Sequence, residues 1–533
     1  MKTRLLLPLL IASLGTAHAV TAPTAFIAYP SLAKTGYSAP GGTDITFSTL
    51  GLAAINPNDE VVFENRLIGS GTSQGRNRAL FAYRSTTTDL TLFGGASFGL
   101  GLPSGTKFTA FLNPIHNRST STAVFQATIS GPGISSSSNR VILQDNNGSP
   151  SVITRTGVPV TSLGNASPSS FVEVLQQEGA NDRLAIVYKL KASTTSSPPT
   201  QSNNDSGLLL MTHAGAVTHG TTREGSPSFA LPISGPPELL GQFGRAAILN
   251  GNAVAFTCKV IYSTRKPIDG LFTTGPFTAK TGLYQGTRQS AFTADELLGT
   301  FTGVGRINNL GLLRTTLTKS PTTTNEAVWN SVGTLLLRKG QDIGSGIKIT
   351  KILRVWGLNS DQLLAHVQLS NKATALILRQ TTNGFLILIS TLAQAPSFIS
   401  GVDVAAIQAI DVDPVNGHYV VLASLKGLGS NENQALWTGQ TTLGNDTTQQ
   451  TLRLPSLQLQ KGSVYVSTNT PNNLIRSISI KPAVDPTGVG ARGLGQQINP
   501  SGATLVTLTG DRGIKELVLL NPSTIIGMIF SPR

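Results

Sequence analysis

Histidines are the first residues of this 533-residue chain whose type suggests metal chemistry, because a neutral imidazole is a common zinc ligand. The closest pair, His213 and His219, is separated by five residues. This spacing does not suit two ligands on one face of a helix, and the segment between them is predicted to contain a turn. We therefore predict no metal site at this pair. The other histidines are isolated in the sequence, at His18, His116, His366 and His418.

The segment from Asp411 to Gly417 superficially resembles a calcium-binding loop, in which oxygen ligands recur at fixed steps. Its sequence, Asp-Val-Asp-Pro-Val-Asn-Gly, lacks the third ligand at the required step and the closing Glu. Asp, Pro, Asn and Gly are also the residues that favour tight turns. We predict a strand that runs into a hairpin turn here, with a weak calcium site as the alternative.

Asp295 and Glu296 are adjacent acids that could take part in glycoside hydrolysis, which needs two carboxyl groups across one cleft. They lie within residues 292–298, where we predict a helical turn. Adjacent residues on a helix point in different directions, so these two side chains are not expected to form the required pair. The sequence alone shows no pair of carboxylates brought together in space.

Cys258 is the only cysteine, so the chain has no internal disulfide, and a lone thiol could act as a nucleophile. It alternates with Val254, Phe256 and Val260 along a predicted strand, which favours a small buried apolar residue. The chain has no phosphate-binding loop, no HExxH, no CxxC and no Gly-x-Ser-x-Gly that follows a predicted strand and opens a helix. We predict no catalytic residue, no metal ligand and no cofactor-binding residue.

The elements that must position these residues belong to a unit that recurs about eight times between residue 50 and the C-terminus. Its first half is a turn rich in Asn, Asp, Pro and Gly, with clear copies at Asn56, Asn308 and Asn499. Such turns are predicted to join antiparallel strands. We predict that the turn asparagines are structural and that Gly502 supplies a positive φ beside Asn499. Weaker copies lie at residues 113–125, 181–187, 249–256, 358–365 and 413–420.

The second half of the unit is a short strand of bulky residues further along the chain. It lies at residues 79–81, 140–143, 207–210, 282–284, 327–329, 375–377, 435–437 and 516–518. A further strand often follows and ends at a glycine turn, as at Gly157, Gly225 and Gly340. About four strands per unit, repeated radially, predict an all-β fold, a β-propeller of seven or eight four-stranded blades over residues 46–533. Residues 20–45 precede the repeats, and their segment 25–29 is predicted to complete the last blade with residues 517–520 and 525–530.

The turn motif resembles that of bacterial exported proteins with tandem Asn-x-x-Gly-x-x-Ala-Phe repeats, often called choice-of-anchor tandem-repeat proteins. Asn308 with Gly311, and Asn499 with Gly502, keep the Asn and Gly positions, and Ala255 precedes a Phe as in the family. The resemblance implies an exported, propeller-like repeat protein, and it supplies no catalytic residue. The family commonly carries a C-terminal surface anchor. Here the apolar residues 524–530 are too few to span a bilayer and are predicted to form a final strand.

The first 19 residues have the features of a signal peptide. Lys2 and Arg4 form a basic start, residues 5–14 are apolar, and Ala17 and Ala19 suit a cleavage site, so the mature chain is predicted to begin at Val20. The apolar stretch is about half the length of a spanning helix, so no transmembrane segment is predicted. We expect a secreted or cell-surface protein, with the periplasm as an alternative location.

The chain carries a net charge of +14, and removal of Lys2 and Arg4 with the leader leaves +12, with a basic isoelectric point. Such a charge favours an anionic polysaccharide or an anionic cell-surface component as partner. The basic residues are scattered and not interleaved with aromatic residues, so no specific nucleic-acid binding is predicted. These features predict a monomeric binding or surface-interaction module without catalysis. The alternatives are a polysaccharide-active hydrolase or lyase with its site in the propeller funnel, and a structural matrix component.

Overall fold

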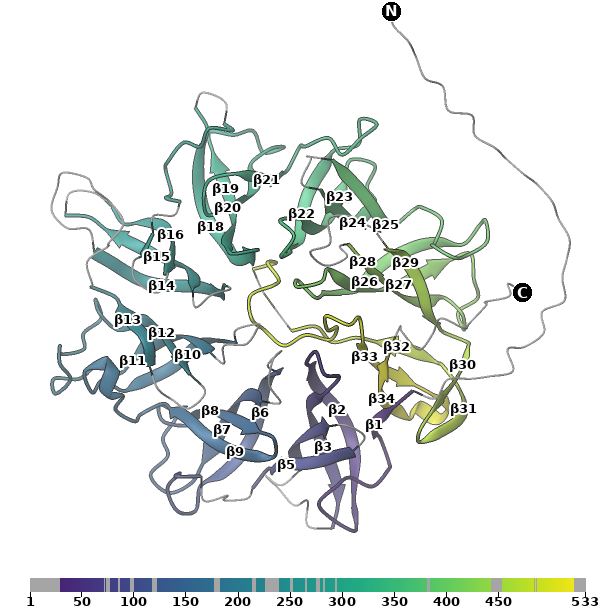
Figure 1. The fold of residues 1–533 in the computed structure, drawn as a ribbon, viewed down its shortest axis with the longest axis horizontal. Coiled ribbons are helices and arrows are strands. Elements are labelled where there is room, and N and C mark those ends of the chain that lie inside the picture. The colour runs from purple at the N-terminus through teal and green to yellow at the C-terminus, as the bar shows by residue number, and fades with distance from the viewer. Residues whose placement is uncertain are drawn as a thin grey trace, which may run out of the picture.

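In the computed structural model the predicted repeat units form eight four-stranded antiparallel sheets, or blades, arranged around one axis (Figure 1). The prediction of an all-β propeller is confirmed, and the number of blades is eight. The structure describes residues 29–70, 72, 77–84, 87–95, 100–116, 122–176, 183–212, 217–225, 239–249, 253–263, 266–274, 279–280, 283–292, 295–380, 384–441, 453–483, 485 and 487–521. The helices among these residues are two single 3₁₀ turns, η1 (Thr161–Leu163) and η3 (Asp511–Gly513).

Blades 1 to 7 each use four consecutive strands, and the first strand of each blade lines the axis. The first strands are β2 (Ile45–Ile55), β6 (Lys107–His116), β10 (Pro168–Gln176), β14 (Leu239–Ile248), β18 (Leu297–Ile307), β22 (Ile349–Gly357) and β26 (Asp403–Val412). The second strands are β3 (Val61–Gly69), β7 (Thr122–Ser130), β11 (Arg183–Leu190), β15 (Val254–Ile261), β19 (Leu310–Thr318), β23 (Leu363–Leu369) and β27 (His418–Lys426). The third strands are β4 (Arg78–Arg84), β8 (Arg140–Asn146), β12 (Ser206–Thr212), β16 (Ile268–Thr274), β20 (Glu326–Asn330), β24 (Thr374–Arg379) and β28 (Gln434–Gln440). The fourth strands are β5 (Thr87–Phe93), β9 (Ser149–Arg155), β13 (Val217–Arg223), β17 (Ala279–Lys280), β21 (Leu335–Arg338), β25 (Phe385–Ser390) and β29 (Arg453–Gln460).

The apolar core of the described residues is divided into eight clusters, one between each pair of neighbouring blades. Successive residues of a strand point to opposite sides, so a strand in the middle of a blade serves two clusters. In β4, Phe81 packs toward blade 8, whereas its neighbour Leu80 packs toward blade 2. Both faces are buried, which explains why the second half of each predicted unit is a run of bulky residues without alternation.

Seven of the eight predicted bulky segments lie on third strands, counting β34 of blade 8. The exception is residues 282–284, where the prediction is wrong: the third strand of blade 4 is β16. Asp269 and Gly270 interrupt the apolar pattern of β16, and this hides the strand in the sequence. Tyr284 instead forms an isolated bridge with Gly270, and its ring packs edge-on against Phe272 with the centroids 5.7 Å apart.

The two ends of the described chain meet in blade 8, which has the order β1 (Ser31–Lys34), β34 (Lys515–Leu520), β33 (Thr504–Thr509) and β32 (Ser477–Ser479). The predicted closing strand was residues 25–29, but the strand that pairs with β34 is β1. Leu32 and Ala33 of β1 are buried in the cluster between blades 8 and 1, and their burial holds β1 in the closing position. Tyr29 forms a parallel bridge to Ser467, while residues 25–28 and 525–530 lie outside the described residues.

A hairpin of β30 (Val464–Ser467) and β31 (Thr470–Leu474) precedes blade 8 and fastens this closure. The hydroxyls of Tyr465 and Thr470 donate to Oε2 of Glu516, each at 2.9 Å, and the Ser467 hydroxyl donates to Oε1. Glu516 lies on β34 and is fully buried. Burial and the neighbouring Glu516 raise the pKa of Tyr465, which keeps its hydroxyl a donor. The buried carboxylate is therefore satisfied by neutral donors from the hairpin.

The turn asparagines have structural contacts, as Asn499 illustrates. Its Oδ1 accepts hydrogen bonds from the backbone N of Ser501 (3.1 Å) and Ala503 (2.9 Å), which closes the turn. Its Nδ2 donates to the backbone O of Asn56 (2.8 Å) and to Oδ1 of Asp59 (2.8 Å). Asn499 therefore joins the turn of blade 8 to the turn of blade 1. Gly502 in the same turn has φ +86°, the positive value predicted from the sequence.

Asn499→Ala is expected to lower the free energy of unfolding by about 1–3 kcal/mol, because it leaves buried backbone donors and acceptors unsatisfied. Urea denaturation of the mature chain measures the change. Asn309→Ala is the matched control, since Asn309 lies in the turn of blade 5 and is exposed. Equal small effects of the two substitutions would contradict a structural role for Asn499.

The first strand of blade 8 is β32. After it the chain turns away from the blade, and residues 480–498, here called the central segment, pass through the middle of the ring (Figure 1). The chain returns to blade 8 at Gln497, whose carbonyl accepts from Leu505 N at 2.7 Å. The first strands of the other seven blades have register shifts against their second strands, as between Leu50 and Ala53 of β2. Blade 8 thus carries a long insertion where the other first strands carry bulges.

The central segment contacts the first strands of the other seven blades. Backbone hydrogen bonds run from Ile55 N to Gln496 O (3.0 Å), Gln176 N to Gly493 O (2.9 Å), Ile248 N to Arg492 O (3.1 Å) and Val355 N to Gly488 O (2.9 Å). In blade 7, Val412 O accepts from Gln496 Nε2 at 3.1 Å. In blades 2 and 5 the contacts are close approaches, of Gly495 to Pro114 O and of Val489 to Gly305. The axis of the ring is therefore occupied by the chain itself.

Candidate functional site

Cys258 lies on β15, where its side chain is 2% exposed in the cluster between blades 3 and 4. Val254, Phe256 and Val260 share that cluster, so the prediction of a small buried residue on one strand face is confirmed. Burial raises the pKa of the thiol well above its ordinary value. A buried thiol that stays protonated does not act as a nucleophile.

The acidic segment after β26 forms a hairpin turn, as predicted. Asp413 is buried, and its carboxylate accepts hydrogen bonds from the backbone N of Val415 (3.3 Å) and Asn416 (2.8 Å). Asp411 points instead to the central segment, where its Oδ2 accepts from Gln497 N at 2.6 Å. Across the described ranges, no three His, Cys, Asp or Glu side chains are grouped so that they could hold a metal ion.

The remaining sequence candidates are dispersed over the ring. Glu296 precedes β18, is buried and forms an ion pair with Arg338, whereas Asp295 is exposed. Part of the helical turn predicted around them, residues 293–294, lies outside the described residues, as does His213. His219 lies on β13, opposite Leu210 of β12. Among the described candidates, Glu296 and His219 are not brought together with each other, with Cys258 or with Asp411.

His366 on β23 has a pKa that is shifted from its ordinary value. Burial lowers the pKa of His366 to about 4, together with the positive charge of Arg354, which lies opposite it on β22. The imidazole is therefore neutral at physiological pH. His116 is buried at the end of β6, and His418 begins β27.

The main concentration of buried charge lies on the axis, around Arg492 of the central segment. Its guanidinium, 2% exposed, forms ion pairs with Glu173 of β10 (2.5 Å) and Asp485 (2.9 Å). Its Nε also donates to the backbone O of Ala246 in β14 at 3.0 Å. Glu173 in turn accepts from Ala246 N (2.8 Å) and pairs with Arg245 (2.9 Å). We call Arg492, Glu173, Asp485 and Arg245 the axial charge cluster.

The axial charge cluster joins the central segment to blades 3 and 4 by charge-assisted hydrogen bonds. The proximity of Glu173 and Asp485 raises the pKa of Arg492 against the opposing effect of burial. Both carboxylates accept hydrogen bonds from Arg492. Glu173 also accepts from the backbone N of Ala246, and Asp485 from the backbone N and the hydroxyl of Thr487. The arrangement stabilises the segment in the channel, and it presents no open carboxylate pair of the kind that glycoside hydrolysis uses.

Sequence reasoning missed the axial charge cluster because Glu173, Arg492 and Ala246 are far apart in the chain. One local signal was present: glycines at 488, 490, 493 and 495 interrupt any strand or helix pattern between residues 480 and 498. Gly490 and Gly495 allow backbone contacts that a side chain would block, since a Cβ on Gly495 would lie 2.2 Å from Pro114 O. Such glycines mark a close approach but do not reveal its partner.

Asp411, which contacts the central segment, has a titration that is strongly altered by burial. Its removal from water raises the pKa of this carboxyl from 3.8 to about 6, although the hydrogen bond from Gln497 N acts in the opposite direction. The folded state therefore holds this proton more tightly than the unfolded state between about pH 4 and pH 6. The contribution of Asp411 to stability is full below pH 3.8 and is lost as the pH rises through 6.

Asp411→Asn is expected to raise the urea midpoint at pH 8, because the amide avoids the burial of a charge and keeps an oxygen to accept from Gln497 N. The gain should shrink toward pH 4, where Asp411 of the wild type is protonated. Urea midpoints of both proteins at pH 4, 5, 6 and 8 measure the difference and cancel the titration of all other groups. A difference that does not change with pH would contradict the raised pKa.

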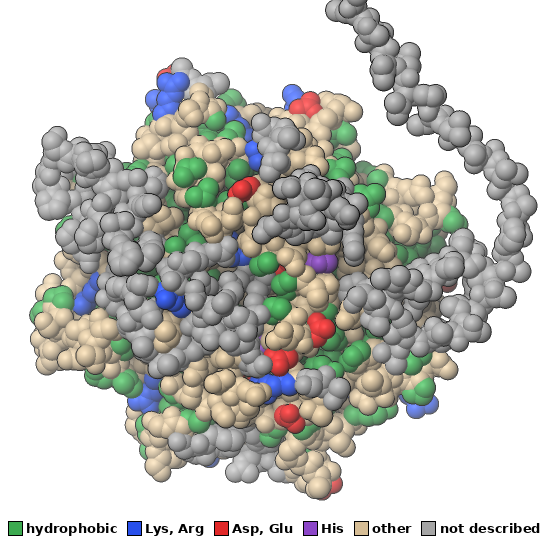
Figure 2. Space-filling view, viewed as in Figure 1, with side chains coloured by type: hydrophobic (Ala, Val, Ile, Leu, Met, Phe, Trp, Pro, Cys, Tyr) green, Lys and Arg blue, Asp and Glu red, His purple; other side chains and the backbone are tan. Residues whose placement is uncertain are grey.

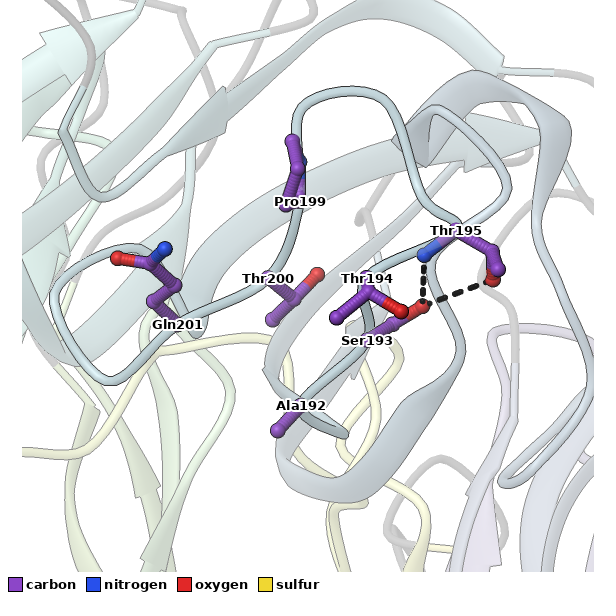
Figure 3. Close-up of a pocket in the computed structure, with 7 residues that line it drawn as sticks. All are labelled: Ala192, Ser193, Thr194, Thr195, Pro199, Thr200 and Gln201. Atoms are coloured by element: carbon purple, nitrogen blue, oxygen red, sulfur yellow. Dashed lines mark hydrogen bonds between the residues drawn. The ribbon is translucent and has the colours of Figure 1, made fainter.

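A shallow concavity lies away from the axis, on the long loop between β11 and β12 (Figure 3). It has a volume of about 410 Å³ and is lined by Ala192, Ser193, Thr194, Thr195, Pro199, Thr200 and Gln201. Its polar groups are hydroxyls and one amide, and Ser193 Oγ already accepts from Thr195 N at 3.2 Å. Without a charged or aromatic group in the lining, it offers little to fix a ligand.

The surface charge differs between regions of the ring. On the face drawn in Figure 2, the visible acidic side chains lie mostly toward the middle and the basic ones mostly toward the rim. No helix in the described part of the chain is long and apolar enough to cross a membrane.

A model of a family of unknown function (DUF7453) matches residues 27–237, and no curated protein matches the chain. Among solved structures, the β-propeller domain of the Trilobed protease from Pyrococcus furiosus is 9% identical, with 77% of this chain and 100% of that chain covered and a TM-score of 0.35. A puromycin hydrolase is 9% identical, with 85% and 62% covered and a TM-score of 0.36. An ulvan lyase is 10% identical, with 79% and 95% covered and a TM-score of 0.29. These similarities assign no activity to this chain.

Proposed function

We propose that this protein is an exported, non-catalytic binding module that recognises an anionic polysaccharide through its outer surface. The observation that carries the proposal is the central segment. It fills the place where a propeller would otherwise hold a ligand in its funnel. The Arg492 side chain and the Gln497 backbone N–H of the segment contact the buried carboxylates there. A partner must then bind outside the axis, where the positive net charge of the mature chain attracts polyanions.

The location of the protein is part of the same proposal. The leader-like residues 1–19 support export to the cell surface, the medium or the periplasm. The Asn-rich turns support kinship with the choice-of-anchor tandem-repeat proteins, in which exported repeats are joined to a surface anchor.

Chromatography of the mature chain on dextran sulfate tests the function, with neutral dextran as the control matrix. We expect retention at about 10 mM salt and release as the ionic strength passes about 0.15 M, where the screening length falls to about 8 Å. Equal retention on neutral dextran would contradict an electrostatic mode of binding.

A polysaccharide-active hydrolase or lyase is the second candidate function, and the same protein preparation distinguishes it. Incubation with alginate, followed by measurement of reducing ends and of absorbance from unsaturated uronate, would detect either reaction. Turnover above a buffer blank would overturn the non-catalytic proposal. We expect none, because the buried carboxylates described on the axis are engaged in structural contacts.

A further inference from the structure

Strand direction divides the surface of the ring into two faces. In blades 1 to 7 the first strand ends and the second begins on the same side of the ring, and in blade 8 the turn at Asn499 leads into the second strand on that side. We call this side the turn face. Because the strands alternate in direction, the starts of first and third strands and the ends of second and fourth strands share the opposite face. We call that opposite surface the loop face. A residue can thus be assigned to a face from its place on a strand.

Nine exposed lysines with no ion pair among the described residues lie at or near strand ends on the loop face. They are Lys107, Lys191, Lys266, Lys319, Lys348, Lys351, Lys372, Lys426 and Lys515. Eight of them begin or precede a first or third strand, or end or follow a second strand, and Lys351 is the third residue of the first strand β22. Every blade from 2 to 8 contributes at least one of them. The sequence shows these residues as scattered, and the antiparallel order of the strands collects them on one side.

The turn face has a different character. Its turns carry Asn56, Asn308 and Asn499 with the acids Asp59, Asp361 and Asp413. Among residues whose burial the structure describes, no exposed lysine lies in these turns. The loop face also carries five exposed acids, Asp44, Asp295, Asp342, Glu432 and Asp511. Its nine lysines outnumber them, so the described part of this face has a net positive charge.

Blade 6 carries three of these lysines, Lys348, Lys351 and Lys372, and its backbone brings them together. Lys348 O accepts from Ser370 N at 2.8 Å, and Lys348 N donates to Ser370 Oγ at 3.1 Å. Lys372 lies two residues beyond Ser370 in the same hairpin, with φ +70°. The one acid paired with Lys348 along the backbone, Asp342, uses Oδ1 to accept from Gly344 N at 2.7 Å. Lys319 of blade 5 and Lys426 of blade 7 flank this group on the neighbouring blades.

We infer that the loop face, centred on Lys348, Lys351 and Lys372 of blade 6, is the surface that binds a linear sulfated or carboxylated polysaccharide. The inference rests on the proposed function and says which surface of the ring binds the polysaccharide. An extended polyanion can follow a row of separated point charges from blade 5 to blade 7 without a pocket. Each contact releases counterions from the polymer, which supplies the free energy of binding at low salt.

The side-chain chemistry favours polysaccharide over nucleic acid. The group centred on blade 6 contains only lysines, which act as point charges toward sulfate or carboxylate. The exposed arginines before first and third strands, Arg288, Arg476 and Arg512, belong to blades 5 and 8, so no exposed guanidinium fork that could read base edges lies within this group. Nucleic-acid surfaces for single strands also use aromatic platforms, and Tyr37 is the one aromatic among the large exposed side chains of the described residues. A lysine row without aromatic neighbours suits a polymer whose anionic groups project from a sugar chain.

Two variants with the same net charge test the inference. The first removes three positive charges from the loop face through Lys348→Gln, Lys351→Gln and Lys372→Asn, where Asn tolerates the positive φ. The second adds three negative charges to exposed positions of turns on the opposite face through Asn147→Asp, Asn309→Asp and Val332→Asp. Thermal unfolding of both variants confirms that each is folded. Binding of dextran sulfate is then measured by fluorescence anisotropy over a range of salt concentrations.

We expect the loop-face variant to bind about tenfold more weakly at low salt, with a slope of log K against log salt reduced by about two to three. The turn-face variant should keep the wild-type slope and lose less than half as much of the binding free energy. Equal losses in both variants would overturn the inference, because net charge alone would then explain binding. Tighter binding of a single-stranded oligonucleotide than of dextran sulfate would overturn the choice of partner. Failure of the wild type to bind dextran sulfate would refute the proposed function itself, which separates the two results.

Discussion

Arg492→Met is expected to lower the free energy of unfolding by about 3–5 kcal/mol, because it leaves the carboxylate of Asp485 buried without its cation and leaves Glu173 only its half-exposed partner Arg245. The side chain of Asp485 is fully buried, and that of Glu173 is 7% exposed. Water cannot replace the lost partner at either group unless the central segment moves. Urea denaturation of the mature chain measures the loss, and Arg492→Lys, which keeps one charge, should show an intermediate value.

Arg245→Gln is the matched control for this substitution. Arg245 pairs with the same carboxylate of Glu173 at 2.9 Å, but its side chain is 40% exposed. A screened, solvated pair contributes within about 1 kcal/mol, so the control should stay close to the wild type. If Arg245→Gln and Arg492→Met had equal effects, burial of the axial charge cluster would not be the source of its stabilising role.

Gly490→Ala is the second substitution with a large expected effect, about 1–3 kcal/mol, since it overfills a packed site. A Cβ at this position would lie 2.1 Å from Cδ1 of Trp356, whose side chain is 1% exposed and cannot swing into water. The central segment must then move away from β22, which breaks the hydrogen bond from Gly490 N to Val355 O at 2.7 Å.

Trypsin provides a local measure of this displacement. The peptide bond after Arg492 is protected in the wild type because the residue is buried, and it should be cleaved in Gly490→Ala, giving a fragment that begins at Gly493. Gly429→Ala is the control, since Gly429 is exposed and a Cβ there would meet nothing within 4 Å. Resistance of Gly490→Ala to trypsin, with unchanged stability, would show that the axis tolerates the extra methyl group.

The strands and turns of this protein follow from local patterns, and these were predictable. The turn residues at Asn56, Asn308 and Asn499 specify antiparallel hairpins through their own backbone contacts. The third strands are recognisable because burial on both sides selects bulky residues without alternation. The prediction failed where local pattern was weak. Asp269 and Gly270 interrupt β16, and Ser31–Lys34 is too short for its pattern to outweigh the more apolar residues 25–29.

The axis was not predictable from the sequence, because its contacts join residues that lie from 86 to 319 positions apart in the two examples below. Nothing near Arg492 in the chain indicates that it meets Glu173, and nothing near Gln497 indicates Asp411. The surface is a related case. Lys348 and Lys372 appear in the sequence as two separate charges, and they share a face only because a hairpin returns the chain to the start of β22. Such relations depend on strand order and direction, which the residue types alone do not encode.

The central segment also sets the order in which the molecule can be completed. A ribosome makes all the strands of blades 1 to 7 before it makes residues 480–498, and Gln497 then has to reach Ala53, 444 positions earlier. Until then the seven first strands face an empty channel and β1 has no β34 beside it. Nascent chains therefore remain unfinished rings until their last blade emerges, a property of folds with high contact order.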